Sequence, residues 1–456
     1  MLVAEAVGHS LAQLGVRRVF GVVGSGNFHV TNALIAAGAT FVPAAHEGGA
    51  ATMADAYARI TGEVGVLSVH QGPGVTNALT GVTEAAKSRT PLLALAPEAP
   101  NPRSNFHIDL PRAASAVGAA FHRVRAESAA GDATYAYRTA EAGATVVLGL
   151  PLDIQSAPAG SDPGPAPAAP VPAEPGPSDV ERMADALARA QRPVFIAGRG
   201  AALQPVDEAR SAILELAERC GALLATSAAA KGLFAGEPWN LDVSGGFASP
   251  LAAELIRGAD LVVAWGSTLN MWTTRHGRLI SPDTVVVQVD RDPAQLGVNR
   301  QVDVAVRGDV TAVARALTAA RLSGGERWRT PELRARIASH IRWRDVSYVD
   351  DSGDGRIDPR TLSIALDDLL PAERTVAVDS GNFMGYPSMF LSVPDAAGFS
   401  FTQAYQSIGL GLASAIGAAV ARPDRRTVAA LGDGGFLMSV AELGTAVRLG
   451  LPLLVV

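Results

Sequence analysis

Two acidic residues that lie far apart in the sequence stand in settings suited to different chemistry. Glu47 follows the apolar run 41–45 and precedes the small residues 48–51. A carboxylic acid in a mostly apolar pocket has a raised pKa, which suits it to donate and accept a proton near neutral pH. Asp433 lies in the glycine turn 432–435, after an expected strand. Backbone N–H groups of such a turn can meet a phosphate, and the carboxylate can hold Mg²⁺ there.

The segments around these acids resemble the signatures of one enzyme family. Residues 46–59 read His-Glu-Gly-Gly-Ala-Ala-Thr-Met-Ala-Asp-Ala-Tyr-Ala-Arg, and residues 431–436 read Leu-Gly-Asp-Gly-Gly-Phe. Together they resemble the thiamine diphosphate-dependent superfamily of acetolactate synthases and 2-oxo-acid decarboxylases. The resemblance implies that Glu47 protonates the aminopyrimidine ring, whose imino group then removes the proton from thiazolium C2. Without the resemblance, Glu47 could be a carboxylate that only favours a helix dipole.

Further stretches resemble segments of this family that contact the cofactor. Asp433 would ligate Mg²⁺, and Ile408 would wedge between the two rings of the cofactor, although a lone Ile is ordinarily a core residue. The other cofactor-binding residues that the resemblance implies are Gly72, Asn77, Phe106, Gly381, Asn382, Gln406, Gly432, Gly434 and Gly435.

The choice between reactions depends on fewer residues. Ser25 and His70 resemble a pair in benzoylformate decarboxylase, in which the Ser helps hold the substrate carboxylate and the His is the acid/base. Each alone could be an ordinary turn or loop residue. Beside Phe106, His107 replaces the Gln usual in acetolactate synthases. The resemblance implies a decarboxylase or carboligase acting on 2-oxo acids, acetolactate synthase-like, with benzoylformate decarboxylase-like chemistry as the alternative.

The end of the sequence suggests a different kind of hypothesis, in which the chain is not an active enzyme. The family's metal motif continues from Gly-Asp-Gly to a later Asn, and the sequence stops at Val456 before that residue. We therefore expect an incomplete last domain and poor cofactor binding by the 456-residue chain. On this hypothesis the chain is an inactive fragment or a cofactor-free binding subunit.

Short apolar runs alternate with helical segments along most of the chain, which predicts parallel sheets covered by helices. Hydrophobic residues make up 48% of the sequence and charged residues 18%. We expect three α/β domains: a pyrimidine-binding domain, a central domain and a diphosphate-binding domain, the last incomplete. The predicted bounds are 1–157, 179–325 and 356–456, joined by an Ala/Pro-rich linker, 158–178, and a connection, 326–355.

Three helix predictions follow from local pattern. Residues 2–14 have apolar side chains on one face, and residues 406–421 are rich in glycine and apolar residues. Ser178 and Glu181 have the spacing of a capping box, which predicts that a helix starts there.

Composition limits the partners. The net charge is −6 without a basic block, so nucleic acid is not expected, and Cys220 is the only cysteine, so no internal disulfide can form. No targeting or membrane-spanning segment is visible, and we expect a cytoplasmic protein. The sequence 197–201 lacks a full Gly-x-Gly-x-x-Gly, so FAD is possible but disfavoured. The resemblance implies a 2-oxo-acid substrate and a homodimer or homotetramer.

Overall fold

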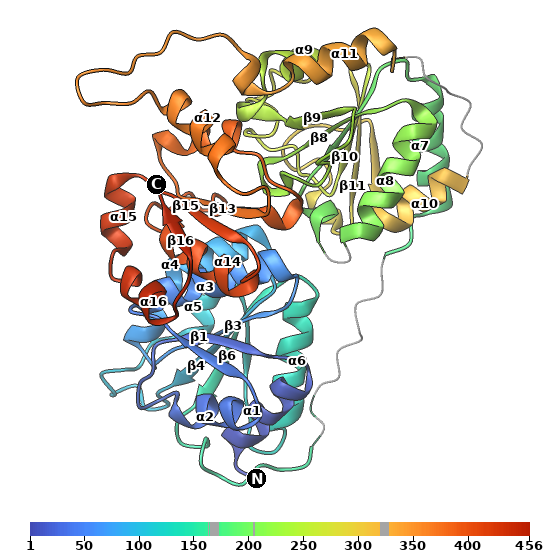
Figure 1. The fold of residues 1–456 in the computed structure, drawn as a ribbon. Coiled ribbons are helices and arrows are strands. Elements are labelled where there is room, and N and C mark those ends of the chain that lie inside the picture. Colours follow the sequence, from blue (N-terminus) through green and yellow to red (C-terminus); the bar gives the residue numbers. More distant parts are fainter. Residues whose placement is uncertain (163, 165–172, 204–205, 320–327) are drawn as a thin grey trace. The chain divides into compact units, whose positions relative to one another are not determined.

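The computed structural model describes residues 1–162, 164, 173–203, 206–319 and 328–456. They form two compact units (Figure 1). The first contains Met1–Pro170, Ala377–Met384 and Thr402–Val456, and the second contains Val171–Val376 and Gly385–Phe401. Much of the predicted linker and the start of the predicted connection lie outside the described residues, so these domain bounds stay predictions.

The N-terminal sheet has six parallel strands in the order β2-β1-β3-β4-β6-β5. The strands are β1 (Arg18–Gly21), β2 (Thr40–Pro43), β3 (Gly65–Ser68), β4 (Leu92–Glu98), β5 (Ala120–Arg123) and β6 (Thr145–Pro151). The helices are α1 (Val3–Gln13), α2 (Phe28–Ala36), α3 (Glu47–Thr61), α4 (Pro73–Ser88), α5 (Leu110–Ala116) and α6 (Ala129–Glu141). Every residue of β3 and β4 is buried, as expected for strands covered on both faces.

The central sheet has six strands in the order β12-β11-β10-β7-β8-β9. The strands are β7 (Pro193–Ala197), β8 (Leu223–Thr226), β9 (Asn240–Val243), β10 (Leu261–Trp265), β11 (Val285–Asp290) and β12 (Val304–Arg307). The helices of this part are α7 (Pro177–Arg189), α8 (Val206–Cys220), α9 (Pro250–Arg257), α10 (Val310–Ala319) and α11 (Pro331–His340).

The start of α7 and the glycine after β7 bear on two predictions for the central part. The predicted start of a helix near Ser178 is confirmed, but the capping box is wrong: α7 begins at Pro177 after the N-cap Gly176, because proline is preorganised for the first helical position. After β7, a Cβ at Gly198 would overlap the backbone at Gly266. Glycine at position 198 therefore allows the loop after β7 to pack closely against the loop after β10.

The C-terminal sheet has the strand order β14-β13-β15-β16, and the division between the two units passes through β13. The strands are β13 (Arg374–Val378), β14 (Phe399–Phe401), β15 (Arg426–Ala430) and β16 (Leu453–Val455). The helices are α12 (Pro359–Leu369), α13 (Gly385–Phe390), α14 (Gly411–Ala421), α15 (Asp433–Ser439) and α16 (Glu442–Arg448). The chain is thus a three-domain α/β protein, as predicted.

The N-terminal and C-terminal sheets share a topology. In each, the second strand along the chain lies on one side of the first, and the third and fourth strands follow on the other side. By this correspondence α3 matches α14, because each joins the second strand of its sheet to the third. Helix α4 likewise matches the α15–α16 pair, because both join the third strand to the fourth.

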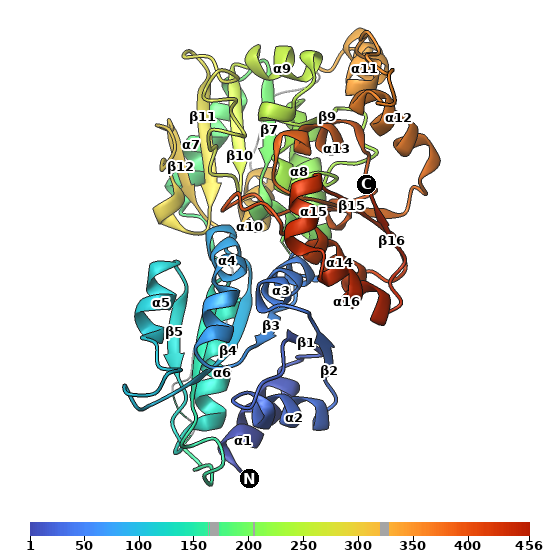
Figure 2. The same cartoon turned by 90° about the vertical axis from the view of Figure 1, so that its left-hand side faces the viewer.

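Helices α3 and α14 lie side by side within the first unit (Figures 1 and 2). Small residues such as Ala50 and Ala54 of α3 pack with Leu412, Ala413 and Ile416 of α14 in one buried cluster. The two helices can approach closely because most of these side chains are small. The N-terminal and C-terminal parts of this unit therefore share a hydrophobic core. Among the described residues, no helix is both long and apolar enough to cross a membrane.

Candidate functional site

Glu47 is the first residue of α3. The preceding residue, His46, caps the helix, since its Nδ1 accepts a hydrogen bond from the Gly48 N–H at 3.0 Å. The Asn77 side chain donates a hydrogen bond to Glu47 Oε2 at 3.0 Å, so the structure brings together these two predicted site residues. Glu47 is only partly buried, in contrast to the apolar pocket expected from the sequence.

The structure also brings the Ser25 turn against His70. The Gly26 N–H donates a hydrogen bond to His70 Nδ1 at 3.3 Å, and Ser25 itself is exposed. Because Nδ1 accepts, neutral His70 carries its proton on Nε2. Asn27, which the sequence analysis missed, accepts a hydrogen bond from the Gly24 N–H at 2.8 Å and is fully buried. Asn27 therefore holds the turn that presents Ser25.

Phe106 completes this group. Its ring meets the His70 ring edge-on, with centroids 5.4 Å apart. Gly72 adopts φ +65°, and a Cβ there would approach the Phe106 carbonyl oxygen to 2.7 Å, so the turn requires glycine at this position. His107 bonds to the Ala99 carbonyl at 2.9 Å through Nδ1, so this ring nitrogen is occupied by the backbone.

Asp379, which the sequence analysis also missed as a site residue, organises the C-terminal part. Its carboxylate accepts hydrogen bonds from the N–H groups of Ser380, Gly409 and Leu410 at 2.8 to 3.2 Å. Burial raises the pKa of the Asp379 carboxyl above its usual value, and these N–H groups act in the opposite direction. The predicted helix over 406–421 therefore begins only at Gly411, because Asp379 holds the preceding residues in a loop.

Ile408 and Gly435 lie beside Asp379. A Cβ at Gly435 would overlap the Asp379 carboxylate and stand 3.2 Å from Ile408 Cγ2. The Ile408 side chain is 47% exposed, which an ordinary core residue would not be. The Gln406 carbonyl accepts a hydrogen bond from the Ser380 hydroxyl at 3.3 Å, so the loop carrying Ile408 is tied to the end of β13.

The predicted glycine turn 432–435 is, in the structure, the N-cap Gly432 and the first three residues of α15. Its exposed residues fit a diphosphate and its metal ion. Asp433 and Gly434 are exposed, and no atom lies within 4 Å of the place where a Gly434 Cβ would stand. Gly381 and Gly432 both border the ring of Phe383, which places the loop of Gly381 and Asn382 beside this turn. One carboxylate suits Mg²⁺, which usually keeps several waters and takes phosphate oxygens. Across the described residues, no group of three or more His, Cys, Asp or Glu side chains could hold a metal by itself.

The predicted residues therefore form two groups in the described structure. The first contains Glu47 with Asn77, and Ser25 with His70, Gly72 and Phe106. The second contains Gly381, Asn382, Gln406, Ile408 and the turn 432–435. No hydrogen bond or ion pair described for the chain joins the Glu47 side chain to this turn.

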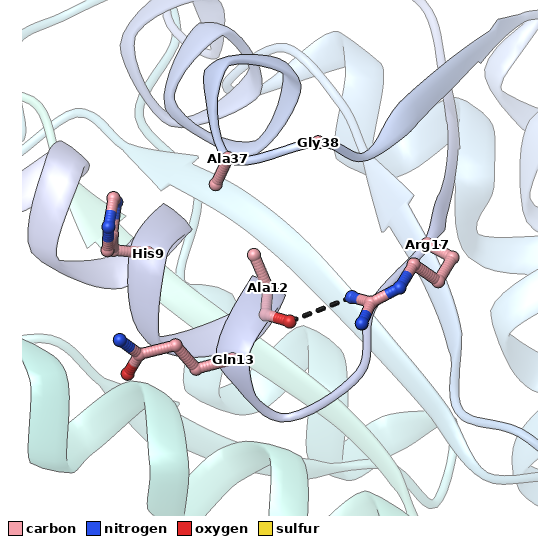
Figure 3. Close-up of a pocket in the computed structure, with 6 residues that line it drawn as sticks. All are labelled: His9, Ala12, Gln13, Arg17, Ala37 and Gly38. Carbon is pink, nitrogen blue, oxygen red and sulfur yellow. Dashed lines mark hydrogen bonds between the residues drawn. The ribbon is translucent and has the colours of Figure 1, made fainter.

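A small open pocket lies elsewhere in the N-terminal part (Figure 3). Its volume is about 250 Å³, and it lies at the ends of α1 and α2. Arg17 at its rim donates a hydrogen bond to the Ala12 carbonyl at 2.9 Å. The lining residues are His9, Ala12, Gln13, Arg17, Ala37 and Gly38, so none of the predicted site residues borders it.

Comparison with known protein families gives three matches along the chain. Residues 1–116 match the thiamine pyrophosphate enzyme, N-terminal TPP binding domain, in which TPP is another name for thiamine diphosphate. Residues 180–317 match the central domain of the same enzymes, and residues 379–456 match their C-terminal TPP binding domain. Glu47 lies in the first match and Asp433 in the third.

Curated relatives span nearly the whole chain. The acetolactate synthase isozyme 2 large subunit of Escherichia coli is 29% identical, covering 99% of this chain and 82% of the relative. A sulfoacetaldehyde acetyltransferase of Alcaligenes xylosoxydans xylosoxydans is 28% identical, covering 99% and 80%. The acetolactate synthase large subunit of Parasynechococcus marenigrum is 30% identical, covering 99% and 75%. With both TPP-binding domains and the central domain matched, this chain belongs to the thiamine pyrophosphate-dependent enzyme family.

Proposed function

We propose that the protein is a thiamine diphosphate- and Mg²⁺-dependent enzyme that decarboxylates a 2-oxo acid and joins the product to a second carbonyl compound, as the name acetolactate synthase suggests for two relatives. One observation carries the proposal: the two TPP-binding domains contain Glu47 and Asp433, respectively. When bound, thiamine diphosphate supplies the electron sink for cleavage of the bond to the carboxylate.

The chain's own residues have separate tasks in this proposal. Glu47 holds a proton at the aminopyrimidine nitrogen, and Asn77 orients its carboxyl group through the hydrogen bond at 3.0 Å. Asp433 would ligate Mg²⁺, and the N–H groups of residues 432–435 would bind the diphosphate. The exposed Ile408 side chain would support the two rings of the cofactor.

A second reaction, simple non-oxidative decarboxylation, is favoured by the geometry of His70. Because Gly26 donates to Nδ1, the opposite nitrogen, Nε2, is left to exchange a proton with the substrate. Ser25, in the same turn, is exposed and can donate its hydroxyl proton to a carboxylate. This arrangement is the one expected for benzoylformate decarboxylase-like chemistry.

Product analysis separates these reactions. The complete protein is incubated with thiamine diphosphate, Mg²⁺ and either pyruvate or benzoylformate, and carbon dioxide, aldehyde and carbon–carbon coupling products are measured. Acetolactate from pyruvate supports the proposal, and aldehyde alone supports the alternative. Sulfoacetaldehyde is the third substrate, chosen because of the second group of relatives. Lack of turnover of the 2-oxo acids by a correctly folded protein that binds the cofactor would contradict both proposals.

We further propose that the active form is at least a dimer, in which Glu47 of one chain and Asp433 of another serve the same cofactor. The resemblance to the family supports this arrangement. The exposure of apolar side chains on α15, on α16 and between these helices also supports it, since another protein surface could cover them. These residues are Leu437, Met438, Val440, Leu443 and Val447.

A further inference from the structure

Glu442, the first residue of α16, is a buried carboxylate with no role in the chemistry proposed above. It is 2% exposed. Its Oε2 accepts a hydrogen bond from the Ala45 N–H at 3.1 Å, and its Oε1 accepts one from the His46 N–H at 3.0 Å. The Thr445 hydroxyl donates a third hydrogen bond, to Oε2, at 2.8 Å.

These bonds fix the residues that lead directly into Glu47. The backbone of His46 is held by Glu442, while its ring caps α3 by accepting from the Gly48 N–H. A Cβ at Gly49 would overlap the Glu442 carboxylate, so α3 is shaped to admit this side chain. The start of α3, where Glu47 stands, is therefore set by a residue from the C-terminal part of the chain.

A second contact of the same kind runs in the opposite direction, from a glutamate of the N-terminal part to backbone amides of the C-terminal part. Glu84 of α4 is fully buried and accepts hydrogen bonds from the Ala404 N–H at 3.0 Å and the Tyr405 N–H at 2.6 Å. Ala404 and Tyr405 lead into Gln406 and Ile408, just as Ala45 and His46 lead into Glu47. Helix α4 follows the Gly72 turn, as α16 follows the turn 432–435 and the short α15.

This correspondence indicates that the contact is a built feature of the fold. The N-terminal and C-terminal sheets share a strand order, and each part sends one buried glutamate to the loop that precedes the matching helix of the other part, α3 or α14. The two differ in one respect: Glu84 is also paired with Arg59 at 2.9 Å, whereas the partners described for Glu442 are N–H and hydroxyl groups.

We propose that Glu442 is a positioning residue for Glu47: by holding the Ala45 and His46 amides, it fixes the direction in which the Glu47 carboxyl group meets the cofactor. This proposal rests on the proposed function, because it assumes that Glu47 acts on thiamine diphosphate. A carboxylate has two acceptor oxygens and can bind both amides, whereas the side-chain amide of Gln has one acceptor oxygen and would turn an N–H toward the other backbone amide.

Two variants remove this contact by different routes. Glu442→Gln changes the carboxylate itself, and Gly49→Ala leaves Glu442 unchanged but displaces it by steric overlap. Thr445→Val is the matched control, since it removes a buried hydrogen bond to Glu442 and leaves those to Ala45 and His46 intact. Thermal unfolding of all three variants shows whether each one folds.

The first measurement needs no cofactor. Hydrogen–deuterium exchange, followed by mass spectrometry of peptides that cover residues 44–50, reports protection of the Ala45 and His46 amides. We expect faster exchange in this segment for Glu442→Gln and Gly49→Ala, and wild-type exchange for Thr445→Val. Wild-type protection in a folded Glu442→Gln variant would overturn the proposal.

The second measurement follows exchange of the C2 proton of bound thiamine diphosphate by NMR. We expect a fall of roughly 10- to 100-fold for Glu442→Gln and Gly49→Ala, because misplacing a reacting group by about 1 Å can cost that much. Cofactor affinity should change little, and Thr445→Val should exchange at nearly the wild-type rate. An unchanged rate in Glu442→Gln would overturn this inference alone. If the wild-type protein itself fails to accelerate C2 exchange, the proposed function fails, and the role of Glu442 fails with it.

Discussion

At the residue scale, the side chains with proposed chemical roles are oriented by neighbouring polar groups. Asn77 binds the Glu47 carboxyl group, and the Gly26 N–H binds the His70 ring. These bonds restrict the orientation of the Glu47 carboxyl group and of the His70 ring.

Glu47→Gln should abolish exchange of the cofactor C2 proton while leaving the fold nearly intact, because an amide cannot supply the proton that the aminopyrimidine nitrogen needs. Exchange is followed by NMR on the complete protein with bound thiamine diphosphate. Asn77→Ala is the companion variant: it keeps the acid, loses its partner and should show a partial reduction. Wild-type exchange in Glu47→Gln would remove Glu47 from this role.

His70→Ala should slow turnover of a 2-oxo acid by roughly 10²–10⁴-fold, the usual contribution of a general acid/base, and should affect cofactor affinity less. Steady-state kinetics and cofactor titration give the two quantities. His107→Ala is the control, because the described bond of His107 is to the Ala99 carbonyl, and its turnover should stay close to wild type. Equal turnover by His70→Ala and wild type would show that His70 has no acid/base role.

Sequence reasoning placed Ser25, His70 and Phe106 in one site through the resemblance, and the structure brings them together. It assigned no role to Asp379 or Glu442. Their partners are backbone N–H groups about 30 and 400 positions away in the sequence, and every residue type except proline supplies such a group. No local pattern therefore marks these carboxylates, and only the folded chain reveals what they hold.

At the scale of elements, strands such as β2 and β11 coincide with short apolar runs of the sequence, from which the parallel sheets were predicted. Helix α14 starts five residues later than predicted, at Gly411 instead of 406, because a tertiary contact with Asp379 overrides the local helical pattern. Boundaries of this kind depend on packing as well as on sequence.

The first turn of α15 allows a matched pair of substitutions. Gly435→Ala should destabilise the protein by about 1–3 kcal/mol, because the new Cβ would overlap Asp379 in a packed site. Gly434→Ala should change stability by less than about 0.5 kcal/mol, because nothing lies near its Cβ. Both should weaken thiamine diphosphate binding, the second by filling the space over the turn. Thermal unfolding and cofactor titration check both effects, and tight binding by Gly434→Ala would show that the diphosphate lies elsewhere.

At the scale of the whole molecule, the two groups of site residues lie on separate parts of the chain. Within one chain, α3 and α14 share a core, and Glu442 ties the start of α3 to α16. The described hydrogen bonds and ion pairs do not join Glu47 to the turn 432–435. From the resemblance to the family, we expect a complete site to use Glu47 from one chain and Asp433 from another.

Mixing Glu47→Gln chains with Asp433→Ala chains should restore part of the activity that each variant lacks, since one hybrid site of a dimer then keeps both native acids. Activity is measured after mixing and refolding, and the formation of mixed dimers is confirmed by mass spectrometry. Each variant alone is the control. Mixed dimers that remain inactive would argue for a site within one chain.

The most direct test of the central claim is calorimetric titration of the complete protein with thiamine diphosphate, with and without Mg²⁺, for wild type and Asp433→Ala. The account predicts saturable binding that requires Mg²⁺ and is strongly weakened in Asp433→Ala, because the carboxylate holds the ion that bridges protein and diphosphate. No binding by the folded wild-type protein would contradict it, as would equally tight binding without Mg²⁺ or in the absence of the Asp433 carboxylate.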